Sequence, residues 1–101
     1  MWVFAMFDLP VDSTDARRQY TRFRKELLKQ GFMMLQYSVY ARYVRSEETE
    51  QVYRRVVRAC LPSEGQVRLV SVTDRQFAKM DVYFGKSRRP VEDPPAQMLL
   101  F

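Results

Sequence analysis

The chain has 101 residues, 47% hydrophobic and 14% aromatic, and its seventeen Lys and Arg against twelve Asp and Glu give a formal net charge of +5. This length suits one domain, the composition excludes a disordered chain, and the charge admits a nucleic-acid partner. The absence of histidine excludes the usual general base and zinc ligand, so any chemistry must rest on carboxylates, water and a hard metal ion, or on a lone hydroxyl or thiol.

Signals for targeting and for oxidising compartments are also missing. The uncharged run from Met1 to Phe7 has neither the basic region nor the cleavage site of a signal peptide. No stretch approaches the ~20 apolar residues of a membrane span. Cys60 is the single cysteine and cannot form an intrachain disulfide. We therefore expect a soluble, cytoplasmic protein without a membrane partner.

The first expected element is a strand from Trp2 to Phe7 that runs into a carboxylate. Its residues are apolar without alternation, which is typical of a strand covered on both faces. Asp8 follows directly, and Pro10 lies in the turn after it. Asp8 is a turn residue, an early helix cap, or a functional acid at the strand tip. The residues alone favour the turn, because Asp is common there.

The second expected element is a helix that starts at the cap signal of Asp12 and Ser13 and runs to about Gln30, with Gly31 as its stop. Its apolar stripe consists of Ala16, Tyr20, Phe23 and Leu27. Basic residues with the same spacing lie nearly opposite, namely Arg18, Arg22, Lys25 and Lys29, with Arg17 and Arg24 on the flank. Glu26 is the only acid between residues 16 and 30, so most of these charges lack a partner on their own helix.

Two interpretations of the basic helix stay open. Exposed charges most commonly form a solvated face. A DNA duplex, however, presents a phosphate charge every ~1.7 Å along its axis, and an unpaired basic stripe suits it. We expect phosphate contacts from four residues, which would position DNA without reading its sequence. They are Arg17, Arg18, Arg22 and Lys25.

The remaining elements follow from period-2 and period-3.6 patterns. The expected strands cover residues 32–35, 38–44, 67–73 and 81–84, and a helix begins at Ser46 and ends before Pro62. Between the last two strands, Thr73-Asp74-Arg75-Gln76 has the composition of a turn. Cys60 falls on the apolar face of the second helix and is expected in the core.

The order β-α-β-β-α-β predicts an α+β, ferredoxin-like domain over residues 1–85. Two helices cover only one face of its antiparallel sheet, whereas the first strand requires cover on both, so we expect a homodimer. Residues 86–101 are expected to form a Pro-rich linker and a C-terminal docking strand. The docking residues are Met98, Leu99, Leu100 and Phe101, pairing with a sheet edge of the same chain or of a partner.

Tyr37, Tyr40 and Tyr43 raise an alternative function. Aromatic residues on a sheet of this topology can stack on bases, which would make the chain a single-stranded RNA-binding module. The RNA-recognition signature K/R-G-F/Y-G/A-F-V-x-F/Y is absent, so packing in the core or in a dimer interface is favoured for these tyrosines.

Four segments together resemble the CRISPR-associated Cas-two family, whose members are small dimeric subunits of the spacer-acquisition machinery. The segments are VFAMFDLP at 3–10, the basic helix after it, GFMMLQYSVYAR at 31–42 and VTDRQFAKMDVYFGK at 72–86. MFDLP, MMLQYSVYAR and TDRQF are most similar to the members that accompany Cas-nine-type (type II) systems.

The resemblance implies a ferredoxin-like homodimer that lies between pairs of Cas-one integrase subunits and holds the double-stranded DNA (protospacer) to be inserted. It implies that the C-terminal segment adds a strand to the partner and forms the Cas-one docking surface. The family carboxylate falls on Asp8 as the catalytic residue and metal ligand, and two copies of Asp8 would share one Mg2+ or Mn2+ ion. Some family members are reported as metal-dependent endonucleases, so a scaffold, which we favour, and an endonuclease acting on RNA or DNA are both open.

Overall fold

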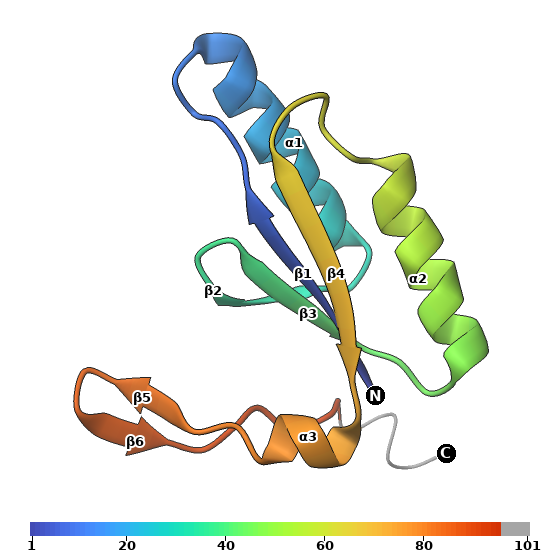
Figure 1. Cartoon of the computed structure of the whole chain (residues 1–101), viewed down its shortest axis with the longest axis vertical. Helices are drawn as coiled ribbons and strands as arrows, with labels where there is room; N and C mark the ends of the chain where they lie inside the picture. The colour runs from blue at the N-terminus through green and yellow to red at the C-terminus, as the bar shows by residue number, and fades with distance from the viewer. Residues whose placement is uncertain (96–101) are drawn as a thin grey trace.

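The computed structural model describes residues 1–95, and its central feature is a four-stranded antiparallel sheet with strand order β2-β3-β1-β4 (Figure 1). The elements in chain order are β1 Trp2–Asp8, α1 Thr14–Lys29, β2 Met33–Gln36, β3 Val39–Tyr43, α2 Glu47–Ala59, β4 Gln66–Val72, α3 Asp74–Ala78, β5 Val82–Phe84 and β6 Ser87–Arg89. The order from β1 to β4 confirms the predicted α+β arrangement of β-α-β-β-α-β. No helix in residues 1–95 is long and apolar enough to span a membrane.

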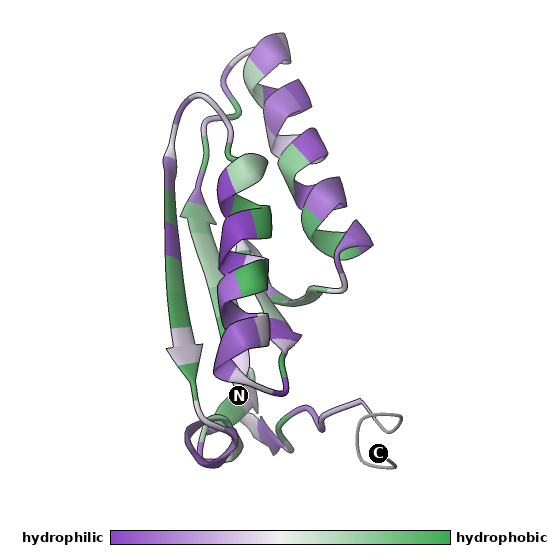
Figure 2. Cartoon of the chain, turned by 90° about the vertical axis from the view of Figure 1, so that its right-hand side faces the viewer, coloured by the Kyte–Doolittle hydropathy of each residue, from purple (hydrophilic) through white to green (hydrophobic). Residues whose placement is uncertain are grey.

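One face of the sheet packs against α1 and α2, which both lie on the same side of it in Figure 2. Val3, Ala5 and Phe7 of β1 point toward the helices and are buried there with Phe23, Leu27 and Val57. The alternation along β1 sends Trp2, Phe4 and Met6 to the opposite, open face. The main core therefore lies between the sheet and the two helices.

Side-chain caps determine where the two long helices begin. The Ser13 hydroxyl accepts the Ala16 N–H at 3.0 Å, and the Ser46 hydroxyl accepts the Thr49 N–H at 3.2 Å. Each bond satisfies one of the free backbone donors at a helix N-terminus. The predicted helix starts are therefore confirmed, and Gly31 (φ 89°) follows the end of α1 as expected.

The segment Thr73 to Gln76 was predicted as a turn, and the structure corrects this prediction. It opens the short helix α3, where Thr73 and Gln76 form a reciprocal capping box. Phe77 in this helix is buried and stacks on Trp2 with ring centroids 4.0 Å apart. Five residues are too few to show a helical period, so the local signal for this helix in the sequence is the spacing of Thr73 and Gln76, which fits a capping box.

The position of α3 also changes the explanation of the apolar first strand. Trp2 and Ala41 are buried beneath Phe77 on the open face, with Val91 packed nearby. Part of the open face of β1 is therefore covered by α3 of the same chain. The sequence analysis had expected a second copy to cover all of this face. Toward the Asp8 end the open face carries Phe4 and Met6, which are half-buried.

The chain after α3 forms a hairpin that does not join the main sheet. β5 and β6 pair with each other through a turn at Gly85. Arg88 forms an ion pair with Asp81 at 2.7 Å, and the Arg89 guanidinium lies over the Phe84 ring at 5.1 Å. The segment predicted as a linker from Lys86 thus includes one short strand. The predicted docking residues Met98 to Phe101 lie outside the described residues.

Candidate strand-end carboxylate and nucleic-acid interface

Asp8 is the last residue of β1, and its side chain is exposed. In the sheet register Asp8 pairs with Gln66, the first residue of β4. On the other side of β1, the Phe7 N–H donates to the Ser38 carbonyl at 3.0 Å, which ties the β2–β3 turn to the same strand end. Asp8 therefore lies between this turn and the start of β4, on the open face of the sheet.

The loop before β4 closes tightly over the end of β1. Gly65 has a φ of 94°, and a Cβ at this position would lie 2.7 Å from the Asp8 carbonyl oxygen and 2.7 Å from a Leu9 methyl carbon. Only glycine combines this backbone conformation with so close an approach. Leu9 is buried in the main core, so the backbone on both sides of Asp8 is held in place.

The oxygen ligands of one chain fit a hard cation only in part. Magnesium is commonly bound by one or two protein carboxylates and keeps several waters. Asp8 offers one such carboxylate, and residues 1–95 contain no group of three or more side chains that would hold a metal ion. Asp8 alone would be the smallest such ligand set, and an ion shared by two copies of Asp8 stays a prediction.

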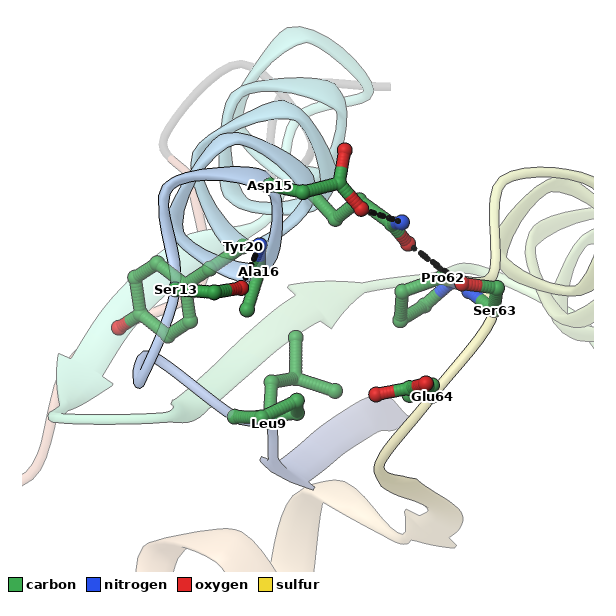
Figure 3. A pocket seen from close by; sticks show the side chains of 10 residues that line it. Leu9, Ser13, Asp15, Ala16, Tyr20, Pro62, Ser63 and Glu64 are labelled. Carbon is green, nitrogen blue, oxygen red and sulfur yellow. Dashed lines mark hydrogen bonds between the residues drawn. The ribbon is translucent and has the colours of Figure 1, made fainter.

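Asp15, the acid in the first turn of α1, is engaged elsewhere. It accepts a hydrogen bond from the Gln19 amide at 3.1 Å, and the Gln19 oxygen accepts the N–H and the hydroxyl of Ser63, each at 3.0 Å. These bonds lie beside a small pocket of about 120 Å³ between α1 and the loop after α2, lined also by Leu9 and Glu64 (Figure 3). The hydrogen bonds between Gln19 and Ser63 thus join α1 to this loop. Asp15 holds the Gln19 side chain and is not directed to a site at Asp8.

The outward surface of α1 carries a shallow basic depression, which is lined by side chains of this helix alone. The lining residues are Thr14, Arg17, Arg18, Thr21, Arg22, Lys25, Glu26 and Lys29. All four residues that the sequence assigned to phosphate contacts therefore share one surface. Arg18, Arg22 and Lys25 are exposed and take part in no ion pair among residues 1–95. We call this surface the α1 groove.

Arg17 connects the α1 groove to the end of β1. Its guanidinium donates to the Val11 carbonyl at 3.2 Å, in the loop that follows Asp8, and to the Thr14 hydroxyl at 3.5 Å. A guanidinium has five N–H donors, so others remain for an anion. The Arg17 guanidinium is thus bound to the loop that follows the strand-end carboxylate Asp8.

Comparison with known proteins agrees with this arrangement. Residues 1–80 match the family described as "CRISPR associated protein Cas2". The chain is 50% identical over 101 residues to the "CRISPR-associated endoribonuclease Cas2" of Parvibaculum lavamentivorans, and the match covers 100% of both chains. The proteins of the same name from Flavobacterium psychrophilum and Ligilactobacillus salivarius are 39% and 32% identical, over 98% and 99% of this chain and 85% and 99% of theirs.

The chain belongs to the Cas2 family. The resemblance to the Cas-two proteins that the sequence showed is thereby confirmed at the level of the family. The family's implied carboxylate, Asp8, is at an exposed strand end in this Cas2 chain, and the α1 groove begins close to it in sequence.

The structure places Tyr37, Tyr40 and Tyr43 in different surroundings. Tyr40 is 1% exposed and stacks on Phe7 with centroids 5.6 Å apart, and Tyr43 packs edge-on against Trp2 at 5.4 Å. Packing is confirmed for these two, and RNA cannot reach the buried Tyr40. Tyr37 is 86% exposed, so a place in the core is wrong for it. Its position just before β3, in a turn, was the signal in the sequence that distinguishes it.

Proposed function

We propose that this chain is the DNA-holding subunit of a CRISPR adaptation complex, which forms a homodimer, binds double-stranded DNA through the α1 groove and bridges Cas-one integrase subunits. The observation that carries the proposal is the α1 groove itself. Its cations are exposed and without acidic partners among the described residues, and they follow one face of a 16-residue helix about 24 Å long. A duplex offers many phosphates over that length.

The open face of the sheet supports the homodimer. Phe4, Met6 and Val70 come together there on neighbouring strands, and Val70 is 41% exposed. β4 is also an edge strand, because no strand in residues 1–95 pairs with its outer side. A second copy would cover this apolar surface and would bring two Asp8 carboxylates and two α1 grooves into one symmetric particle.

Removal of the groove cations should weaken duplex binding and its salt dependence. Replacing Arg17, Arg18, Arg22 and Lys25 by Ala removes about four phosphate contacts per chain, so the slope of log affinity against log salt should become less steep by about 3 to 4 for each chain of the dimer that contacts the duplex. Filter binding of unrelated duplex sequences over a salt series measures this slope, and little difference between sequences is expected.

A matched control loses the same charge elsewhere. Replacing Arg45, Arg55, Arg58 and Arg75 by Ala also removes four exposed cations, but none of them lines the α1 groove. This variant should keep most of the wild-type slope. Equal losses in both variants would show a net-charge effect, and affinity that barely responds to salt would refute the proposal.

Cleavage of phosphodiester bonds is the second role to be tested, because the relatives carry the name endoribonuclease. We infer that two Asp8 side chains of a dimer would hold one Mg2+ ion, with Mn2+ as its substitute. Such an ion supplies a metal-bound water of lowered pKa as the nucleophile, which suits a chain without histidine. The chain itself contributes the ligand oxygen and the strand end that orients it. One carboxylate per chain is a sparse ligand set, and we favour the scaffold role.

Substitution of Asp8 separates the two roles. Because Asp8 is exposed, Asp8→Asn should leave the melting temperature and the binding of duplex DNA nearly unchanged. Any metal-dependent cleavage should be lost, as measured with labelled RNA and DNA in the presence and absence of Mg2+. The scaffold role fails if spacer acquisition stops in this variant while dimerisation and DNA binding persist.

The partner and the system type need further tests. We propose that residues 98–101 dock Cas-one, and a chain truncated after residue 96 should lose Cas-one in a pull-down. A parallel measurement of its mass in solution shows whether the same residues hold the dimer. We propose from the segments MFDLP and TDRQF that the chain comes from a type II system, which predicts a Cas-nine-type effector gene, an integrase gene and a repeat array beside its own.

A further inference from the structure

We propose that Tyr37 is a stacking platform that holds one unpaired nucleobase beside Asp8. The inference rests on the proposed binding of nucleic acid and adds a contact that the α1 groove does not provide. The ligand is a single-stranded stretch or end of RNA or DNA. Both nucleic acids offer the same feature to the Tyr37 ring, which is the flat face of an unpaired base.

The β2–β3 turn that contains Tyr37 lies at the Asp8 end of β1. β1 and β3 pair antiparallel, with Ala5 opposite Tyr40 and Met6 opposite Val39. The hydrogen bond from the Phe7 N–H to the Ser38 carbonyl continues this register by one residue. Tyr37 precedes Ser38 in this turn, so it lies at the same end of the sheet as Asp8.

Tyr37 has no packing role within the described chain. With 86% of its surface exposed, it is the most exposed large hydrophobic residue in residues 1–95. The backbone of Tyr37 is nonetheless part of a defined two-residue turn. Gln36 pairs with Val39 across this turn, and Ser38 adopts a φ of 61° within it. A rigid turn that presents a bare aromatic ring loses little conformational entropy on binding a flat ligand.

The neighbouring charges favour an unpaired nucleotide over other flat ligands. Arg17 is held at the Val11 carbonyl in the loop after Asp8, so a cation with further donors for a phosphate is fixed to the loop that leaves this strand end. A base inside a duplex is already stacked on both faces, so only an unpaired base can use the ring. The arrangement thus predicts contacts with a single strand at the Asp8 end and with duplex phosphates along α1.

Fluorescent single strands test this contact directly. We would titrate the wild-type chain and variants with short RNA and DNA strands that contain 2-aminopurine, whose fluorescence falls on stacking. Tyr37→Ala should weaken single-strand binding about 5- to 100-fold and abolish the quenching, because aromatic stacking contributes on that order per base. Tyr37→Phe should retain both. Tighter binding of RNA than DNA would identify RNA as the source of the base, and the reverse would identify DNA.

Two controls separate this proposal from the one on which it rests. Tyr83 on β5 is 59% exposed, and Tyr83→Ala should leave binding and quenching unchanged. Duplex binding should be unaffected by Tyr37→Ala. Unchanged single-strand affinity in Tyr37→Ala would overturn the role of Tyr37 alone, as would a loss of self-association without any loss of quenching. A wild-type chain that binds neither single strands nor duplex would overturn the proposed function itself.

Discussion

At the scale of single residues, the buried carboxylate Glu50 joins the second helix to the sheet. It is 8% exposed, accepts the Ser71 hydroxyl from β4 and pairs with Arg54 at 3.1 Å. Arg54 also donates to the Ser71 hydroxyl at 3.0 Å, so the three side chains form a closed network. The Ser71 hydrogen bond, opposed by burial and assisted by Arg54, holds the pKa of Glu50 below its ordinary value of 4.5.

Neutralising Glu50 should destabilise the fold in a pH-dependent way. Near neutral pH, Glu50→Gln should lower the free energy of unfolding by about 1–3 kcal/mol, because it weakens hydrogen bonds to a charged group. A lowered pKa in the folded state stabilises the protein above pH 4.5, and this contribution is lost as the pH falls through the lowered value. The difference from wild type should therefore shrink on acidification.

Urea denaturation at several pH values measures this difference. Glu48 lies in the same helix and is exposed, so Glu48→Gln provides a matched control with a small effect at every pH. A destabilisation by Glu50→Gln that stays constant down to strongly acidic pH would contradict the role of the ionised carboxylate.

At the scale of elements, turns rather than strand interiors determine the surroundings of Asp8. The β2–β3 turn is bound to β1 through Ser38, and the loop before β4 meets β1 at Gly65. Both turns contain a residue of positive φ, at 61° and 94°. The strand end that carries Asp8 is thus positioned from two sides by backbone contacts.

Substitution of Gly65 should disturb this strand end. Gly65→Ala forces a Cβ to within 2.7 Å of a backbone oxygen, in addition to about 1–2 kcal/mol of strain at positive φ, so we expect a loss of more than about 2 kcal/mol in stability. Gly85 also has a positive φ but meets nothing within 4 Å, so Gly85→Ala should cost only the strain. Chemical denaturation compares them, and equal losses would show that the close approach at Gly65 is unimportant.

At the scale of the whole molecule, the two faces of the sheet differ in how they are covered. α1 and α2 cover most of one face, while α3 covers the open face at Trp2 and reaches as far as Phe4 (Figure 1). Beyond Phe77, Met6 is half-buried and Val70 is exposed on the open face. The proposed homodimer would bury this remainder.

A charge on the open face should separate the proposed dimer. Val70→Asp places a carboxylate among Phe4 and Met6, and the chain should still fold because Val70 is 41% exposed. Val52 on α2 is 44% exposed on the other side of the molecule, so Val52→Asp is a matched control that should keep the wild-type mass. Light scattering after size exclusion measures both. A wild-type monomer, or a Val70→Asp variant that stays dimeric, would contradict the proposed interface.

Local signals in the sequence predicted most of the elements. Ser13 and Ser46 indicated the helix starts, alternation separated the two faces of β3, and the apolar spacing of α1 identified Phe23 and Leu27 as core residues. Such signals depend on neighbours within one or two turns, so they can be read without the fold. Asp8 was likewise placed correctly at the end of the first strand.

Only the tertiary structure decided what surrounds those elements. The stacking of Trp2 on Phe77 packs the short helix α3 against the sheet, and the hydrogen bond from Phe7 to Ser38 brings the turn that contains Tyr37 to the Asp8 end of β1. These contacts join residues far apart in the chain, and their formation depends on how the whole sheet assembles. The sequence by itself thus determined the order of strands and helices and the basic face of α1, whereas which residues meet at the strand end followed from long-range packing.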